Sequence, residues 1–183
     1  MEKDLIIFTD CGDTLVDEST QIFDDNGDVL KADFFDGAEE TLKALNEEGY
    51  RIILVADGRI ASFHNIFREL GMEYIFEQWV ISEEFGQEKP ASIMFETAMQ
   101  RAGLTDADKH RIVMIGNNIQ RDIVGANRMG ICSILQSQSP RYDMTASTVE
   151  ETPDYVVSKP SELLTLLEQL DLQIKNKKVL NRA

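Results

Sequence analysis

The chain has 183 residues, of which 43% are hydrophobic, so it is long and apolar enough for one globular domain with a substantial core. It carries 18 Lys and Arg against 33 Asp and Glu, a formal net charge of −15. A surface this acidic repels phosphate backbones and anionic lipids, which argues against nucleic acid and membranes as general partners. An anionic substrate would have to be attracted locally, by a metal ion or a helix N-terminus.

No part of the sequence indicates export or membrane insertion. The apolar run at residues 5–8 is far too short for a signal peptide, and no segment approaches the length of a membrane span. Cys11 and Cys132 lie at the ends of different predicted strands, so a disulfide framework is not expected. Cys11 is interpreted as a small buried residue rather than a reactive thiol. We therefore predict a protein of the reducing cytoplasm.

Strand-like and helix-like runs alternate from the N-terminus onward. Residues 5–9 predict a strand, and Asn26-Gly27 in the next stretch is a strong signal for a β-hairpin at about residues 20–33. The following helix is predicted to be capped by Asp36 and to end at Gly49. Apolar periodicity then predicts strands at 51–56, 79–82, 111–116 and 132–135, alternating with helices at about 60–70, 92–102 and 122–129.

The last part of the chain predicts a polar loop, an edge strand at 154–157 and a final helix starting near Ser161. Residues 1–172 are interpreted as a single core domain, and residues 173–183 as a basic C-terminal tail that frays. Strands that alternate with helices predict a three-layer, Rossmann-like α/β fold, a parallel sheet with helices on both faces. In such folds the ligand binds at the carboxyl ends of the strands.

Polar residues follow four of the predicted strands, at the point where each strand ends. They are Asp10 and Thr14 after the first strand, Asp57 after the second, Lys89 after the third, and Asn117 and Asp122 after the fourth. Because parallel strands end at one edge of the sheet, these side chains are expected to converge there. Carboxylates, a lysine and amide groups together suit the binding of an oxyanion and a hard cation.

Three of these stretches resemble motifs of the haloacid dehalogenase superfamily, most of whose members are magnesium-dependent phosphatases. The first motif is an apolar strand followed by Asp10-Cys11-Gly12-Asp13-Thr14-Leu15. The others are Lys89 in "EKPASIMFETAMQRAGL" and the stretch "IVMIGNNIQRDIVGANRMGI". The resemblance covers roughly residues 5–135 and implies the three-layer fold typical of that superfamily.

The resemblance also implies a role for each matching residue. Asp10 would be the nucleophile that forms an aspartyl-phosphate, and Lys89 would neutralise it together with the phosphoryl oxygens. Mg²⁺ would be held by Asp10, the Gly12 carbonyl, Asn117 and Asp122. The residues expected to contact phosphate or order its loop are Thr14, Ala56, Asp57 and Gly58.

Three positions depart from the pattern of that superfamily. Gly12 stands in place of the general acid–base Asp, Ala56 in place of a phosphate-binding Ser or Thr, and Asn117 in place of a charged metal ligand. Loss of a general acid–base group typically costs on the order of 10²–10⁴ in rate. Asp13 is a candidate to replace it, although Asp13 would equally suit a loop residue bonded to nearby backbone N–H groups. Asn118 is interpreted as a turn residue.

Two functions are therefore open. One is a magnesium-dependent phosphomonoester hydrolase that is inefficient or narrow in substrate range. The other is a catalytically impaired protein that binds a phosphorylated ligand or partner in a regulatory role. The gaps between motifs leave room for a small β-hairpin flap but no large cap domain, which disfavours a true dehalogenase. An open site suits a large phosphorylated substrate, or a small phosphorylated molecule enclosed by a neighbouring subunit of a homo-oligomer.

Overall fold

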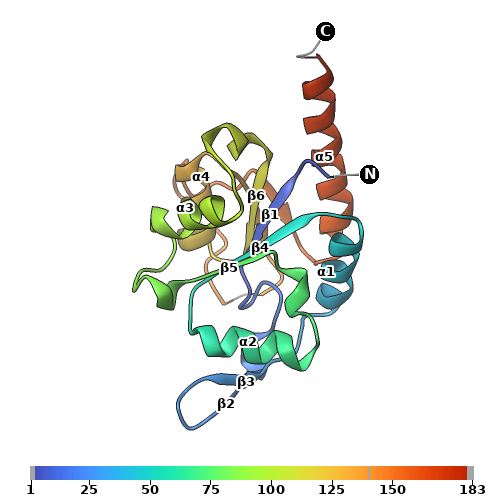
Figure 1. The fold of residues 1–183 in the computed structure, drawn as a ribbon. Helices are drawn as coiled ribbons and strands as arrows, with labels where there is room; N and C mark the ends of the chain where they lie inside the picture. Colours follow the sequence, from blue (N-terminus) through green and yellow to red (C-terminus); the bar gives the residue numbers. More distant parts are fainter. Residues whose placement is uncertain (1–2, 140, 181–183) are drawn as a thin grey trace.

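The computed structural model describes residues 3–139 and 141–180 (Figure 1). A six-stranded sheet forms its centre, with the strand order β5-β4-β1-β6-β7-β8 and every neighbouring pair parallel. The strands are β1 (Ile6–Thr9), β4 (Arg51–Ala56), β5 (Gln78–Ile81), β6 (Ile112–Gly116), β7 (Cys132–Gln136) and β8 (Tyr155–Val157). The parallel α/β sheet is confirmed, and β8 is the predicted edge strand.

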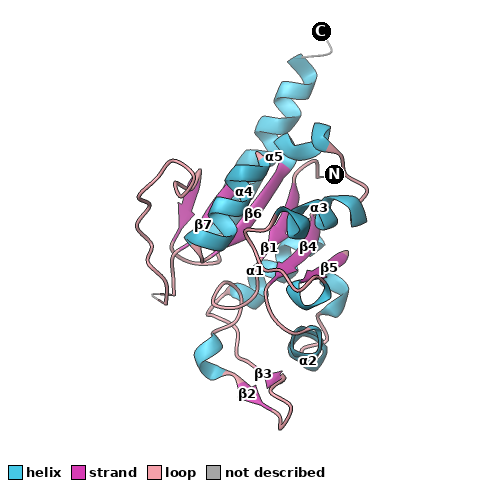
Figure 2. Cartoon of the chain, turned by 90° about the vertical axis from the view of Figure 1, so that its left-hand side faces the viewer, coloured by secondary structure: helices cyan, strands magenta, loops and turns pink. Residues whose placement is uncertain are grey.

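Helices cover both faces of this sheet (Figures 1 and 2). One face carries α1 (Ala38–Glu47), α2 (Ile60–Glu69) and α5 (Glu162–Leu180), and the other carries α3 (Ser92–Arg101) and α4 (Val124–Met129). Successive β1 side chains point to opposite faces, so Ile7 joins the first core while Ile6 and Phe8 join the second. All three are at most 1% exposed, which explains why the strands read as continuous apolar runs.

The predicted hairpin is present between β1 and α1. Its strands are β2 (Ile22–Phe23) and β3 (Val29–Lys31), paired antiparallel. The Val29 N–H donates to Ser62 Oγ at 2.9 Å, and the Asn65 amide donates to the Val29 carbonyl at 3.0 Å, so the hairpin is fixed to α2. Across residues 3–139 and 141–180, that gap holds this hairpin and a short 3-10 turn, Glu18–Thr20, and no large cap domain is present. None of the helices in this same part of the chain is long and apolar enough to cross a bilayer.

Two local predictions are wrong. The N-cap of helix α1 is Gly37 rather than Asp36, and no side chain caps the helix. Gly37 has φ 77°, because the chain enters the helix through a left-handed turn that glycine adopts without strain. The segment from residue 173, expected to fray, continues α5 as far as Leu180. Ile174 is 9% exposed and belongs to the core, so packing holds this end of the helix. Residues 181–183 lie outside the described part.

Asp171 joins α5 to the first strand and provides a test of this packing. Its Oδ1 accepts hydrogen bonds from the N–H groups of Asp4 (2.7 Å) and Leu5 (3.0 Å), and its Oδ2 pairs with Lys175 at 2.7 Å. Asp171→Ala is expected to lower the free energy of unfolding by about 2–3 kcal/mol in urea denaturation, because both N–H groups lose a charged acceptor. Asp171→Asn, which keeps an acceptor oxygen, should lose less.

The pH dependence of the same contact has a defined sign. Burial alone would raise the pKa of Asp171, but Lys175 and the two N–H groups outweigh it and lower that pKa. The stabilisation is therefore present above the unfolded pKa of about 3.9 and is lost as the pH falls through the folded value. An Asp171→Ala variant as stable as the parent at pH 7 would contradict this account.

Candidate active site

The chain turns sharply where β1 ends, and this turn presents Asp10 at the edge of the sheet. The Asp10 N–H still donates to the Ile115 carbonyl of β6 at 2.9 Å, so its backbone is held as part of the sheet. The N–H groups of the next turn then converge on the Cys11 carbonyl, from Thr14 at 3.2 Å and Leu15 at 2.7 Å. A short buried strand followed by a tight turn thus fixes the Asp10 side chain, which is 13% exposed.

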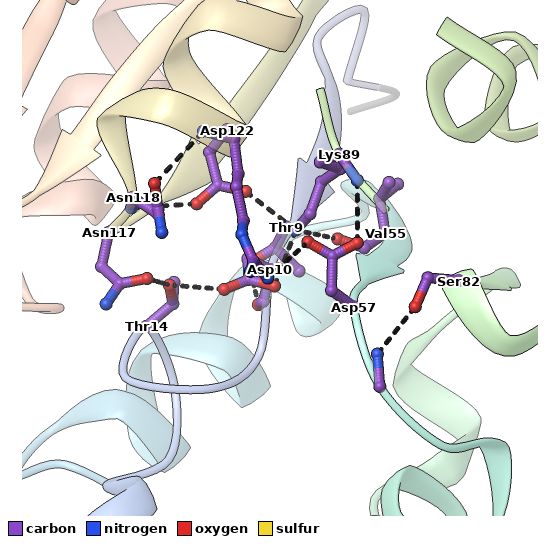
Figure 3. Close-up of polar contacts among 12 residues, drawn as sticks. Thr9, Asp10, Thr14, Val55, Asp57, Ser82, Lys89, Asn117, Asn118 and Asp122 are labelled. Carbon is purple, nitrogen blue, oxygen red and sulfur yellow. Dashed lines mark hydrogen bonds and ion pairs between the residues drawn. The ribbon is translucent and has the colours of Figure 1, made fainter. Parts of the chain in front are cut away.

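Lys89 joins the ends of three strands in one cluster (Figure 3). Its Nζ donates to Asp10 Oδ1 and to the Val55 carbonyl, both at 2.8 Å, and pairs with Asp122 Oδ1 at 2.8 Å. Two of these contacts are hydrogen bonds, and the contact with Asp122 is an ion pair. Lys89 and Asp122 side chains are each 1% exposed, so the cluster lies in a low-dielectric interior.

The charges of this cluster are strongly coupled. Burial alone would lower the pKa of Lys89, but Asp10, Asp122 and Asp57 outweigh it and raise that pKa. Burial raises the pKa of the Asp122 carboxyl, and the nearby Asp10 charge adds to this effect while Lys89 opposes it. Lys89 therefore stays charged at neutral pH and holds the nucleophile candidate in place.

A cavity of about 40 Å³ opens beside Lys89 at this edge of the sheet. Four carboxylates line it against two cations, so its walls carry more negative than positive charge. The lining residues are Asp10, Gly12, Glu18, Asp57, Lys89, Asn117, Asn118, Arg121, Asp122 and Tyr142. Six of them were singled out from the sequence as site residues. Glu18, Arg121 and Tyr142 were not, because they belong to no motif that indicates this chemistry.

Thr14 and Asn117 form the side of the cavity next to Asp10. The Thr14 hydroxyl is shared between Asp10 Oδ2 at 3.2 Å and Asn117 Oδ1 at 3.3 Å, so the amide oxygen of Asn117 lies on the side of the nucleophile candidate (Figure 3). The Asn117 Nδ2 is buried without a hydrogen-bond partner. A buried amide nitrogen of this kind typically costs about 1–3 kcal/mol.

Asp122 is positioned by a π-helical turn, Ile119–Ile123, that precedes α4. Asn118 caps this turn by accepting a hydrogen bond from the Arg121 N–H at 3.2 Å. The Asn118 N–H in turn donates to Asp122 Oδ2 at 3.0 Å. Asn118 is thus a turn residue, as predicted, and the unusual turn directs Asp122 toward Lys89.

The residues expected to contact phosphate occupy different positions around the cavity. Asp57 accepts a hydrogen bond from the Lys89 N–H at 3.0 Å and pairs with Arg121 at 3.4 Å. The Gly58 N–H already donates to Ser82 Oγ at 2.9 Å (Figure 3). Ala56 is completely buried at the end of β4. A phosphate contact by these residues or by the buried Thr14 stays a prediction.

Asp13 points away from the cavity. Its backbone has φ 51°, a left-handed conformation that Asp adopts more readily than most residues. Its Oδ1 accepts a hydrogen bond from the Glu18 N–H at 3.1 Å, and its Oδ2 pairs with Arg141 at 2.7 Å. Asp13 is 3% exposed and does not line the cavity. These contacts favour the loop role over the catalytic one.

Neither cysteine forms a disulfide. Cys11, next to Asp10, is completely buried, and this burial raises the pKa of its thiol. A thiol with a raised pKa is a weak nucleophile at neutral pH, which supports its interpretation as a small buried residue.

Several known proteins are similar to this chain in sequence. Residues 8–130 match a family model described as a haloacid dehalogenase-like hydrolase. A glyceraldehyde 3-phosphate phosphatase from Methanopyrus kandleri is 32% identical over 130 residues, which cover 71% of this chain and 54% of that protein. A ribulose-1,5-bisphosphate 5-phosphatase from Halopiger xanaduensis is 32% identical over 134 residues, covering 71% and 55%. The chain spans about half the length of these relatives.

A solved structure supports the fold. A putative hydrolase of the same family from Bacillus subtilis, bound to magnesium, superposes with a TM-score of 0.64 at 23% identity, over 74% of this chain and 56% of that one. At this level of identity the likeness concerns the fold alone.

Proposed function

Because the chain belongs to the haloacid dehalogenase-like hydrolases, we propose that it is a phosphomonoester hydrolase that acts through an aspartyl-phosphate on Asp10. The observation that carries this proposal is the buried cluster in which Lys89 holds Asp10 Oδ1 and Asp122 at the mouth of the cavity. Lys89 holds Oδ1, so the attacking oxygen is proposed to be Oδ2, which accepts a long hydrogen bond from the Thr14 hydroxyl at 3.2 Å. The phosphatases of Methanopyrus kandleri and Halopiger xanaduensis support the same reaction type.

The proposed reaction has two steps. The Asp10 carboxylate attacks phosphorus, the bond from phosphorus to the leaving oxygen breaks, and an aspartyl-phosphate forms. Water then attacks the same phosphorus and releases phosphate and free Asp10. Lys89 offsets the negative charge that gathers on the phosphoryl oxygens. The first step needs a proton for the leaving oxygen, and the second needs a base for the water.

Mg²⁺ fits the residues at this edge of the sheet. Asp10, Asp122, the Asn117 amide oxygen and the Gly12 carbonyl offer the oxygen ligands that this ion prefers. Within residues 3–139 and 141–180, no three His, Cys, Asp or Glu side chains group closely enough to hold a metal. Two of the four ligands would thus be uncharged oxygens, those of Asn117 and Gly12, which predicts weak binding. The ion would supply positive charge to the phosphoryl group.

Asn117→Asp tests this account of the metal. The substitution replaces an unpaired amide nitrogen with a charged oxygen in an already acidic cavity. We expect the variant to have a lower melting temperature than the parent in EDTA and a larger rise in melting temperature when Mg²⁺ is added. Its affinity for Mg²⁺, measured by calorimetry, should be at least ten-fold tighter. Equal Mg²⁺ affinity in the two proteins would contradict Asn117 as a ligand.

The substrate is proposed to be a phosphorylated small molecule, because the relatives are named as phosphatases of glyceraldehyde 3-phosphate and ribulose-1,5-bisphosphate. A larger phosphorylated substrate, or closure of the open site by a second copy of the chain, would also suit this geometry. The free cysteines support the reducing cytoplasm as its location. Gly12, Ala56 and Asn117 favour the alternative function, a regulatory protein that binds a phosphorylated ligand without turnover.

A screen of phosphorylated metabolites with Mg²⁺ tests the proposal. Release of phosphate from at least one compound is expected, abolished by EDTA and absent from an Asp10→Asn blank. Acid-quenched wild-type protein should carry phosphate on Asp10 by peptide mass spectrometry. If no compound is hydrolysed above the blank while one of them binds, the regulatory alternative holds instead.

A further inference from the structure

The carboxylate of Glu18 lies beside Gly12, a residue without a side chain in the loop after β1. A Cβ built on Gly12 would overlap the Glu18 carboxylate, at 2.8 Å from its Cδ. The backbone of Gly12 is not in the left-handed region, so a side chain at residue 12 would cause no backbone strain and would meet only the flexible end of Glu18. Glu18 comes from the short 3-10 turn Glu18–Thr20, six positions further along the chain. The Glu18 carboxylate thus occupies the space that a side chain at residue 12 would take.

Two contacts hold Glu18 toward the cavity. Arg141 forms ion pairs with both Glu18 and Asp13, and Asp13 also accepts the hydrogen bond from the Glu18 N–H. Asp13 and Arg141 therefore clamp the turn from its backbone and its side chain. The Glu18 side chain is 29% exposed, so one part of its carboxylate is paired while the cavity side stays accessible.

Glu18 also lines a second, larger pocket. This pocket has a volume of about 210 Å³ and lies between the β1 loop, the β2–β3 hairpin and α2. Gly12, Glu18 and Asp57 are shared by its wall and the wall of the smaller cavity. If phosphorus is attacked by Asp10 in the smaller cavity, the adjoining pocket is the space for the group that leaves. Glu18, which lines both pockets, would then lie next to the bond that breaks between phosphorus and the leaving group.

Each of the other carboxylates of the cavity has contacts on both of its oxygens, whereas Glu18 pairs with Arg141 through Oε2. Asp10 is the proposed nucleophile, and Asp122 is paired with Lys89. Asp57 accepts from the Lys89 N–H and pairs with Arg121. The Tyr142 hydroxyl is the remaining proton carrier of the lining, on a surface loop where its residue is 38% exposed.

We propose that Glu18 is the catalytic acid and base of this protein, an inference that rests on the proposed phosphatase function. In the first step the Glu18 carboxyl gives its proton to the oxygen that leaves phosphorus. In the second step the resulting carboxylate takes a proton from the water that attacks the aspartyl-phosphate. The group returns to its starting state, so no other reactant is required.

The test compares Glu18→Gln with Glu84→Gln. Glu84 is a matched control because it is 26% exposed, pairs with Arg101 at 2.6 Å and lies outside both pockets. On phenyl phosphate, Glu18→Gln is expected to lower kcat on the order of 10²-fold or more, and Glu84→Gln less than about two-fold. On 4-nitrophenyl phosphate, whose leaving group needs no proton, the first step should persist. The phosphorylated enzyme should then accumulate, visible by intact-protein mass spectrometry.

Variants that move the carboxylate from residue 18 to residue 12 distinguish a catalytic role of Glu18 from a role in supporting the loop. Glu18→Ala should be slow, and Glu18→Ala combined with Gly12→Asp should recover at least ten-fold in kcat, because the vacated space accepts the new side chain. Glu18→Gln that behaves like Glu84→Gln on both substrates overturns the proposal. So does Tyr142→Phe if that variant alone shows the defect. Failure of the proposed function is distinct, since wild-type protein would then match Asp10→Asn on every substrate.

Discussion

Asp10→Asn is expected to abolish phosphate release, with a loss on the order of 10⁴-fold or more in kcat, because an amide cannot attack phosphorus. The fold should survive, since the amide keeps the volume of the carboxylate and an oxygen that accepts from Lys89. Thermal unfolding should change little, while a colorimetric phosphate assay shows no turnover. A variant that retains activity would rule out the covalent mechanism.

Asp13→Asn is the matched control, because it makes the same change three residues away in the same loop. Asn tolerates the left-handed φ of 51° as well as Asp does, and its amide oxygen still accepts the Glu18 N–H. Only the charge opposite Arg141 is lost. We expect kcat to stay within about ten-fold of the parent, well short of the loss of about 10²–10⁴-fold that is typical when an acid–base group is removed. A complete loss would return Asp13 to the role of catalytic acid.

The sequence predicted the sheet and the central cluster of the site because both depend on local patterns. Buried parallel strands read as apolar runs, and the residue after each run must lie at one edge of the sheet. Asp10, Lys89 and Asp122 each come after such a run, and in the structure both carboxylates lie 2.8 Å from Lys89 Nζ. The hairpin was equally readable, from the Asn26-Gly27 pair at its tip.

The parts that sequence could not predict depend on contacts between distant segments. Glu18 lies in a turn without periodicity, and Arg141, which pairs with it, comes from a polar loop more than a hundred residues later. The extension of α5 is similar, because Ile174 and Asp171 secure a basic segment that has no apolar pattern of its own. For Asp13 the sequence left two roles open, and its left-handed backbone and its contacts with Glu18 and Arg141 favour the loop role.

Lys89→Met should have the largest effect on stability of any single change in the site. Lys89 is the cation that compensates Asp10 and Asp122, and its side chain is 1% exposed. Removing one partner of a buried ion pair typically costs about 3–5 kcal/mol, because the remaining charge cannot regain its water. Turnover should also disappear, since nothing else in the cluster holds Asp10 Oδ1.

The pH dependence separates this electrostatic cost from a simple loss of packing. Without Lys89, neighbouring buried carboxylates repel each other, so their folded pKa values rise above the unfolded values. The penalty is then present at neutral pH and is relieved as the pH falls and the carboxyls take up protons. The difference in unfolding free energy between parent and Lys89→Met, measured in urea, should therefore shrink from pH 7 to pH 5. A packing defect would leave that difference constant.

Lys43→Met provides the comparison on the surface. Lys43 also pairs with a carboxylate, Glu39, at 2.5 Å, but its side chain is 41% exposed and the pair lies one turn apart on α1. Exposed pairs of this spacing contribute about 0.3–0.5 kcal/mol, so Lys43→Met should leave stability almost unchanged at every pH. The same substitution thus has a large, pH-dependent effect only where the lysine is buried among carboxylates. Equal effects at the two positions would mean that Lys89 does not neutralise the cluster.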